Sequence, residues 1–213
     1  MREASLAGES RAGAQRTCIV CDVSDRAVVL GSTQPRSDVD LARCEALGAA
    51  VVRRRSGGGA VFVAPGAQIW VDVYLPPGDP LADQDVARSF LWFGRAWAAA
   101  VSFAAPEAAG PVTVVPPGTP PTRWARTLCF GSLGAGEVTV GGRKVVGISQ
   151  RRDRHGLWLH SMALLTDTSR ELVECLSLDD ANRVEATAAL SDGAATIDAA
   201  AGELVAALLG ALP

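Results

Sequence analysis

The chain has 213 residues, enough for one domain with a sizeable hydrophobic core, and 48% of them are hydrophobic, which excludes a wholly disordered chain. A formal net charge of −3 argues against nucleic acid as a partner. The sequence has no apolar run near the ~20 residues that span a bilayer, and its polar N-terminus does not resemble a secretory signal. We therefore expect a cytoplasmic protein with no membrane partner.

The first half of the chain predicts mainly strands. Residues 26–33 (RAVVLGST) form a buried apolar run that ends in turn residues, which indicates a strand. Residues 38–48 predict a short helix, with Asp38 as its N-cap and Gly48 at its end. Residues 49–55 and 59–63 predict strands on either side of three glycines. Residues 67–75 alternate and are rich in β-branched and aromatic side chains, which predicts another strand.

The second half predicts helices around one hairpin. Residues 83–101 carry apolar side chains at helical spacing after Asp83, a candidate N-cap. Residues 104–123 are rich in Pro, Gly and Ala and predict a long mobile loop with one short strand. The tail predicts two helices, 169–177 and 195–211, and the order of elements favours an α+β fold over strict βαβ alternation.

Residues 137–149 (EVTVGGRKVVGIS) predict a β-hairpin, because Gly-Gly separates two β-branched runs. The two-residue period places Lys144, Val146 and Ile148 on one face and Val145 on the other. Lys144 is the only lysine among 20 basic residues. A lysine that points to an apolar interior is costly without a partner or a task, so Lys144 is a candidate functional residue.

Five cysteines, at positions 18, 21, 44, 129 and 175, are an odd number, which favours free thiols over a disulfide framework. The lone CxxC of Cys18 and Cys21 is better explained by an early strand than by a zinc or redox site, and no metal is expected.

Residues 53–59 (RRRSGGG) place three arginines directly before the three glycines. The segment lacks the GK[ST] ending of a P-loop and the spacing of a dinucleotide fingerprint, and an ordinary hairpin is one explanation. Without Cβ atoms, however, a ligand can lie against the strand, and an arginine can reach an anionic or carbonyl group. The segment is therefore a candidate binding strand.

These segments together resemble a known family. RRRSGGGAVF at 53–62 and GGRKVVGISQRR at 141–152 are similar to motifs of the catalytic domain shared by lipoate–protein ligases, octanoyltransferases and biotin–protein ligases. The motifs are most similar to those of the lipoate branch. Residues 28–34 (VVLGSTQ) also resemble the first strand of that branch. The resemblance covers roughly residues 26–167 and implies a central mixed β-sheet flanked by helices.

The implied domain organisation is a catalytic domain over residues 1–167, with residues 1–16 flexible, and a helical extension of the same domain over 168–213. The resemblance implies that Lys144 contacts the acyl carbonyl. The substrate-binding residues that it implies are Arg54, Ser56, Gly57, Gly58, Gly59, Ala60, Gly147, Ser149 and His160. A core histidine remains an alternative for His160. Val63 and Ala64 stand where the family has His-Asp, which leaves the acyl substrate open.

Cys129 lies eight residues before Glu137, where octanoyltransferase and amidotransferase members carry a nucleophilic cysteine. A buried structural thiol is the alternative. An ammonium group nearby favours a thiolate. The resemblance thus implies an acyltransferase that needs no cofactor. It would move an octanoyl or lipoyl group from an acyl carrier protein, through a Cys129 thioester, onto a lysine of a lipoyl-type domain or a glycine-cleavage H-type protein.

Two other functions remain open. The first is an ATP-dependent lipoate–protein ligase, which would use ATP, Mg²⁺ and free lipoate or octanoate to make a lipoyl-adenylate. Many lipoate ligases need a small C-terminal accessory domain for adenylate formation, and the resemblance does not include it. This favours a transferase, or a ligase whose second part is a separate chain. The second is a non-catalytic relative that binds an acyl group or a lipoyl domain.

Overall fold

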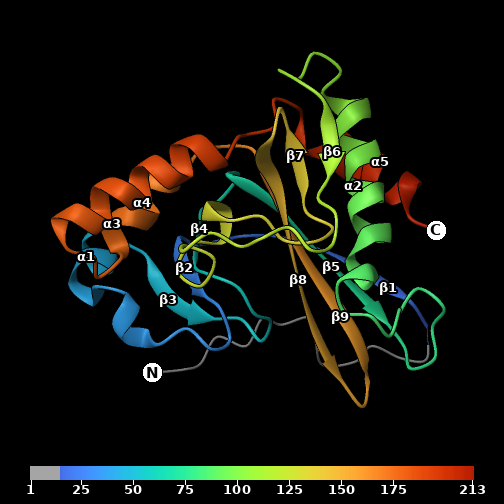
Figure 1. The fold of residues 1–213 in the computed structure, drawn as a ribbon, viewed down its shortest axis with the longest axis horizontal. Helices are drawn as coiled ribbons and strands as arrows, with labels where there is room; N and C mark the ends of the chain where they lie inside the picture. Colours follow the sequence, from blue (N-terminus) through green and yellow to red (C-terminus); the bar gives the residue numbers. More distant parts are fainter. Residues whose placement is uncertain (1–14) are drawn as a thin grey trace.

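The computed structural model describes residues 15–213 and contains two sheets (Figure 1). The larger sheet has six strands in the order β1-β5-β9-β8-β7-β6, and each neighbouring pair is antiparallel. Its strands are β1 (Thr17–Cys21), β5 (Gln68–Leu75), β6 (Val112–Val114), β7 (Val138–Val140), β8 (Arg143–Asp153) and β9 (Gly156–Leu164). The smaller sheet has the order β3-β2-β4, formed by β2 (Ala27–Leu30), β3 (Ala50–Arg53) and β4 (Val61–Val63).

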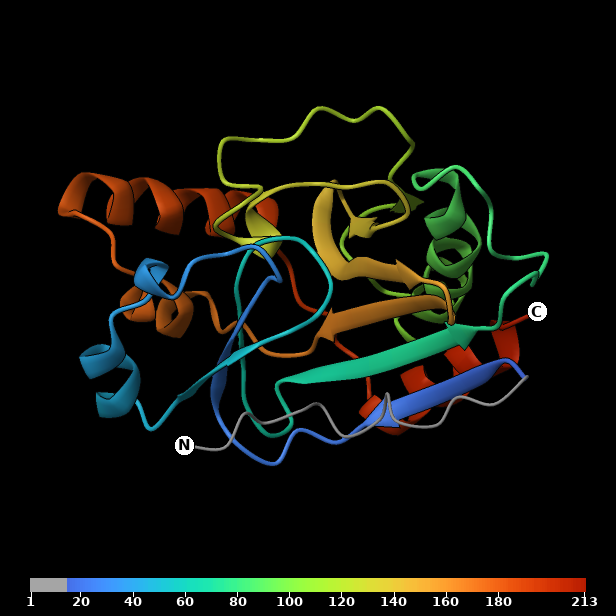
Figure 2. The same cartoon turned by 90° about the horizontal axis from the view of Figure 1, so that it is seen from below.

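The helices form two groups on either side of the β8–β9 hairpin (Figures 1 and 2). In one group, α2 (Leu91–Ala104) and α5 (Ala201–Ala211) pack on one face of the larger sheet and bury a core with it. In the other group, α1 (Leu41–Ala46), α3 (Ser169–Cys175) and α4 (Asp180–Gly193) surround the smaller sheet and bury a second core. The candidate site lies between the sheets, at the one-turn helix η4 (Cys129–Gly131). This helix contacts β8 of the larger sheet, and its Cys129 N–H donates to the carbonyl of Ala60, which directly precedes β4 of the smaller sheet.

This architecture confirms the expected α+β fold with helices that flank the sheet. The parallel pairing that makes it mixed lies in the smaller sheet, between β2 and β3. The strand expected around the CxxC motif is β1, and its alternation sends Cys18 into the core under α2 and Cys21 into the other core. One metal ion could not readily bridge two thiols on opposite faces of a strand.

The predicted starts of α1 and α2 are wrong, and hydrogen bonds from nearby backbone N–H groups to aspartate side chains explain both. The N-cap of α1 is Asp40 rather than Asp38, because the Asp40 carboxylate accepts from the backbone N–H groups of Ala42 and Arg43. The helix expected from residue 83 begins at Leu91, after the turn η3 (Arg88–Phe90). The carboxylates of Asp83 and Asp85 accept from backbone N–H groups just ahead, which offers that segment an alternative to helix.

The C-terminal segment also differs from expectation. Helix α4 was missed because its polar, Ala-rich sequence has little amphipathic pattern; it buries only Ala186 and Leu190 and begins at the N-cap Asp179. The helix expected from residue 195 begins at Ala201. Residues 194–200 instead lie along the larger sheet, where Ala195 N–H donates to the carbonyl of Lys144.

The expected flexible segment over residues 1–16 falls almost entirely outside the described residues. None of the helices within 15–213 combines the length and the apolar character that crossing a bilayer requires. The predicted short strand of the 104–123 loop is β6.

Candidate active site

A bulge in the β7–β8 hairpin sets the direction of Lys144. The turn residues Gly141 and Gly142 both have positive φ, as a two-residue hairpin turn requires. Lys144 pairs with Thr139, but Val146 pairs with Val138, so β8 has one extra residue at this point. A Cβ added at Gly147 would lie 3.2 Å from Cε of Lys144, whereas Val146 and Ile148 belong to the core under α2. The prediction that Lys144 shares their face is therefore wrong.

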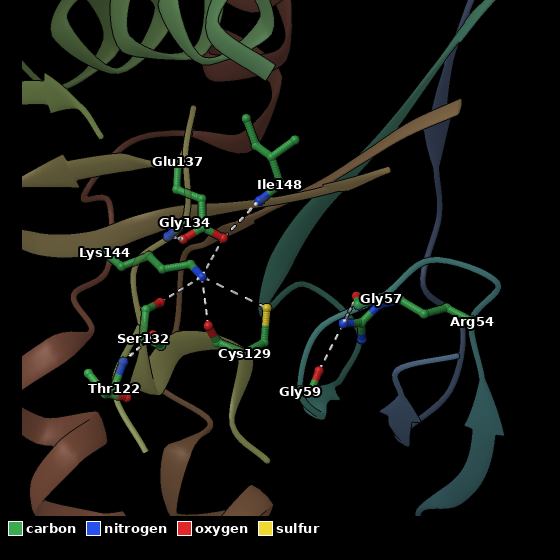
Figure 3. Close-up of polar contacts among 10 residues, drawn as sticks. All are labelled: Arg54, Gly57, Gly59, Thr122, Cys129, Ser132, Gly134, Glu137, Lys144 and Ile148. Atoms are coloured by element: carbon green, nitrogen blue, oxygen red, sulfur yellow. Dashed lines mark hydrogen bonds and ion pairs between the residues drawn. The ribbon is translucent and has the colours of Figure 1, made fainter. Parts of the chain in front are cut away.

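The ammonium group of Lys144 is buried in a socket of three oxygen acceptors (Figure 3). Its Nζ lies 2.6 Å from Oε1 of Glu137, 2.6 Å from the carbonyl oxygen of Cys129 and 3.2 Å from that of Ser132. The side chain of Lys144 is only 2% exposed. The three N–H groups of the ammonium therefore each have an acceptor, and one acceptor carries a compensating charge.

The carboxylate of Glu137 also has backbone hydrogen-bond partners. Its Oε2 accepts from the N–H of Gly134 at 2.7 Å, and its Oε1 accepts from the N–H of Ile148 at 3.3 Å. Burial raises the pKa of the Glu137 carboxyl, while the charge of Lys144 and these N–H groups act in the opposite direction. The sequence did carry a signal for this pair, because a Gly-Gly turn places Thr139 opposite Lys144 and Glu137 diagonal to it on the same face.

Cys129 is joined through backbone hydrogen bonds to the end of the glycine segment, which is a loop between β3 and β4 rather than the expected strand. The N–H of Ala60 donates to the carbonyl of Thr127, and the N–H of Cys129 donates to the carbonyl of Ala60. A Cβ at Gly59 would lie 2.5 Å from the nitrogen of Leu128, so this approach requires glycine. The contact places Sγ of Cys129 4.0 Å from Nζ of Lys144.

Arg54 shapes the glycine segment from within. Its guanidinium donates to the carbonyl oxygens of Gly57 at 2.7 Å and Gly59 at 2.9 Å (Figure 3). It also donates to the carbonyl oxygen of Val29 at 3.3 Å. The residue is buried, and this burial lowers its pKa. The neighbouring Arg53 also donates to backbone, at the carbonyl of Gly31. Two of the three arginines therefore satisfy carbonyls of the loops that approach the site.

A small cavity of about 20 Å³ collects five of the sequence-predicted residues. It is lined by Arg54, Cys129, Gly147, Ser149 and His160, together with Val61, Trp70, Ile148, Ser161 and Met162. Its volume has room for about one water molecule. Ser56 closes one side, because its hydroxyl lies 2.8 Å from that of Ser149.

The remaining predicted residues lie outside this cavity. Gly58 and Gly59 pack against Arg54 and Leu128, and Ala60 pairs with Leu128. A Cβ at Gly57 would meet no atom within 4 Å, so Gly57 borders open space. Val63 is buried opposite Ala27 in the smaller sheet.

His160 projects from β9 beside Asp72, which faces it on β5. Nδ1 of His160 lies 2.9 Å from Oδ1 of Asp72, and the indole N–H of Trp70 donates to the same oxygen at 2.8 Å. The ring of Trp158 stacks on the imidazole at an interplanar angle of 7°. Sequence reasoning found His160 but missed Asp72, whose single charge lies in the apolar strand 67–75.

The chain is similar to known proteins in sequence and in fold. The family model described as the lipoyl protein ligase A/B catalytic domain matches residues 2–207. The octanoyltransferase LipM of Exiguobacterium sp. is 26% identical over 166 residues, which cover 76% of this chain and 58% of that protein. The chain thus spans less than two thirds of the length of this relative.

Two solved structures share the fold. A bi-partite lipoate protein ligase from Thermoplasma acidophilum, part of an archaeal lipoylation system, superposes with a TM-score of 0.68 at 20% identity, over 93% of this chain and 70% of that one. A lipoate-protein ligase A bound with ATP gives a TM-score of 0.67 at 18% identity, over 93% and 72% of the two chains. Because the family model matches nearly all of its length, the chain belongs to the family of the lipoyl protein ligase A/B catalytic domain.

Proposed function

We propose that this chain is an acyltransferase that moves an octanoyl or lipoyl group from an acylated carrier protein to a lysine of a lipoyl-type or glycine-cleavage H-type protein. The observation that carries the proposal is the 4.0 Å approach of Sγ of Cys129 to the buried ammonium of Lys144. A cation so close to a thiol favours the nucleophilic thiolate. The thiol is half-buried and lines the small cavity, from which an incoming thioester would approach it.

The first step would be attack by the Cys129 thiolate on the carbonyl carbon of the donor thioester. The bond from that carbon to the carrier sulfur breaks, and the carrier leaves as a thiolate. Lys144 stabilises the negative charge that develops on the carbonyl oxygen, because its ammonium acts in a site from which water is largely excluded. Its N–H groups are engaged, and the longest contact, to the carbonyl of Ser132 at 3.2 Å, is the one an acyl oxygen would replace.

The acyl chain needs more room than the cavity provides at about 20 Å³. Its walls are partly apolar and include Met162, whose unbranched side chain adopts several rotamers readily. The chain would enter by displacing such side chains toward the open space beside Gly57. Burial of its methylene groups contributes about 0.8 kcal/mol each.

The sequence also left open an ATP-dependent ligase. Three arginines beside the glycine segment could make phosphate contacts, and two of them, Arg53 and Arg54, direct N–H groups to backbone carbonyls instead. The curated relative that matches 76% of this chain is an octanoyltransferase. Both observations support the transferase, which requires neither ATP nor Mg²⁺.

Intact-mass analysis after incubation with octanoyl carrier protein tests the proposal. The wild-type chain should gain one octanoyl mass at Cys129, and Cys129→Ala should gain none. Cys44→Ala is the matched control, because Cys44 is a buried thiol that contacts the carbonyl of Cys175 in α3 and does not line the cavity. An unmodified wild-type chain that exchanges pyrophosphate into ATP would establish the ligase instead. Binding of a lipoyl domain without either activity would establish the non-catalytic function.

A further inference from the structure

A row of polar side chains crosses the larger sheet beneath the candidate site. Register places Asp72 of β5 opposite His160 of β9, and His160 opposite Ser149 of β8. Asp72 and His160 are each buried to more than nine-tenths. Two ionisable side chains side by side in a sheet interior are costly to bury, so a role is to be expected for them.

Neither nitrogen of the imidazole has a hydrogen-bond partner among the described residues. Nδ1 of His160 faces the carboxylate of Asp72 within ion-pair distance, 2.9 Å from its Oδ1, whereas no charged group faces Nε2 at such a distance among these residues. His160 lines the cavity that Cys129 also lines, and Asp72 does not. Nε2 is thus the nitrogen left to serve a group in the cavity. The other ionisable groups that line it are Arg54 and Cys129.

We propose that His160 is the general base for the second half of the reaction, the transfer from acylated Cys129 to the acceptor lysine, and that Asp72 is its positioning residue. This inference rests on the proposed function. Lys144 is a poor choice for the task, because all three of its N–H groups have acceptors and Glu137 balances its charge. His160 is uncommitted and has a nitrogen that can both accept and return a proton.

The step balances without a co-reactant. The ammonium of the acceptor lysine gives one proton to Nε2 of His160 and becomes a neutral amine. The amine attacks the carbonyl carbon of the Cys129 thioester, a C–N bond forms, and the C–S bond breaks. The imidazolium returns its proton to the departing Sγ of Cys129, and the second proton of the attacking nitrogen leaves to solvent. Asp72 stabilises the imidazolium while it carries the proton.

The experiment separates loading from discharge. His160→Gln and Asp72→Asn are loaded with octanoyl carrier protein, freed of donor, and mixed either with a lipoyl-type domain or with hydroxylamine. Hydroxylamine is already a neutral amine near about pH 7, so its attack does not need the first proton transfer. We expect both variants to load at Cys129, and we expect their discharge to hydroxylamine to fall far less than their discharge to lysine. Discharge of His160→Gln to lysine should fall by roughly 10²–10⁴-fold.

His155→Gln is the matched control, because His155 is the chain's other histidine and is exposed in the β8–β9 turn. It should discharge to lysine as the wild type does. Asp72→Asn keeps a side-chain oxygen that can accept from the indole N–H of Trp70. A slower transfer of the acyl group from this variant to lysine therefore reports the missing charge rather than the loss of that hydrogen bond.

Each outcome decides the matter. Equal discharge of His160→Gln and wild type to lysine would overturn the inference and leave the proposed function intact. A folded His160→Gln chain that loses hydroxylamine discharge as well would also overturn it, because the residue would then support the whole site. A wild-type chain that never loads would remove the proposed function and this inference with it.

Discussion

Lys144 and Glu137 form a buried ion pair, with 2.6 Å between Nζ and Oε1, at the point where the bulge interrupts the β7–β8 hairpin. The side chains are 2% and 7% exposed. The pair adjoins Cys129, because Nζ of Lys144 also donates to the carbonyl of Cys129 and lies 4.0 Å from its Sγ. The ion pair with Glu137 therefore fixes the position of the lysine charge relative to the thiol.

Removal of the negative charge of Glu137 should destabilise the chain. Glu137→Gln leaves the Lys144 ammonium buried without a counter-charge, which typically costs about 3–5 kcal/mol. Urea unfolding followed by tryptophan fluorescence measures the change. The matched control is Glu185→Gln, whose carboxylate pairs with Arg123 at the surface at 2.6 Å with more than half of each side chain exposed. That substitution should change the unfolding free energy by about 1 kcal/mol or less.

A double substitution separates stability from activity in this pair. Glu137→Leu with Lys144→Met replaces two buried charges by apolar side chains, which is often neutral for stability. The double variant should therefore recover most of the unfolding free energy lost in either single variant, and yet form no acyl-enzyme. Recovery of acyl transfer along with stability would show that Lys144 has only a structural role.

Gly147→Ala should slow loading of Cys129 while the fold is kept. The added Cβ would lie 3.2 Å from Cε of Lys144, so the lysine side chain must shift by a few tenths of an ångström, while 3.5 Å from Sγ of Cys129 is an ordinary contact. Misplacement on this scale reduces the loading rate by about tenfold. The rate is followed by intact mass with octanoyl carrier protein.

Gly202→Ala is the control for that substitution, because a Cβ at this exposed helical position meets no atom within 4 Å. It should load at the wild-type rate. An unchanged rate in Gly147→Ala would contradict the proposal that the thiol and the ammonium react from their present positions.

The five thiols should differ in their reaction with iodoacetamide. Burial raises the pKa of Cys21 to about 12 and that of Cys175 to about 12, so at about pH 8 each is a thiolate in only about one molecule in 10⁴. Cys129 is half-buried beside an ammonium and should be modified first. Peptide mass spectrometry over time measures the order.

Cys175 also serves as an internal control for that experiment. It is fully buried, so its modification reports unfolding. Labelling of Cys21 as fast as that of Cys129, with Cys175 still protected, would contradict the expected activation of Cys129.

Arg54→Lys should destabilise the glycine segment although the charge is kept. A lysine ammonium cannot reproduce the planar fork that reaches the carbonyls of Gly57, Gly59 and Val29 together. Carbonyls left unsatisfied cost about 1–3 kcal/mol in urea unfolding. Arg123→Lys, at an exposed arginine, should stay within about 0.5 kcal/mol of the wild type. Equal stability of the two variants would show that the glycine segment holds its shape without Arg54.

The strands and the hairpin turn could be predicted because their signals are local. Alternation in residues 67–75 and the Gly-Gly turn at 141–142 depend on neighbouring residues alone, and the structure confirms both. Helix α4 carried too little amphipathic pattern to be found, and the start of α2 was decided by the carboxylates of Asp83 and Asp85, which compete for backbone N–H groups.

By itself, the sequence determined the candidates for the site, since its only lysine, the glycine triplet and Cys129 all stand in segments that resemble family motifs. Only the tertiary structure decided how they meet. The bulge at the hairpin turned Lys144 away from the aliphatic core, the contact of Gly59 with Leu128 brought Cys129 to it, and two distant strands placed Asp72 beside His160. These outcomes depend on strand register and close backbone approach between segments far apart in the chain, which no local pattern records.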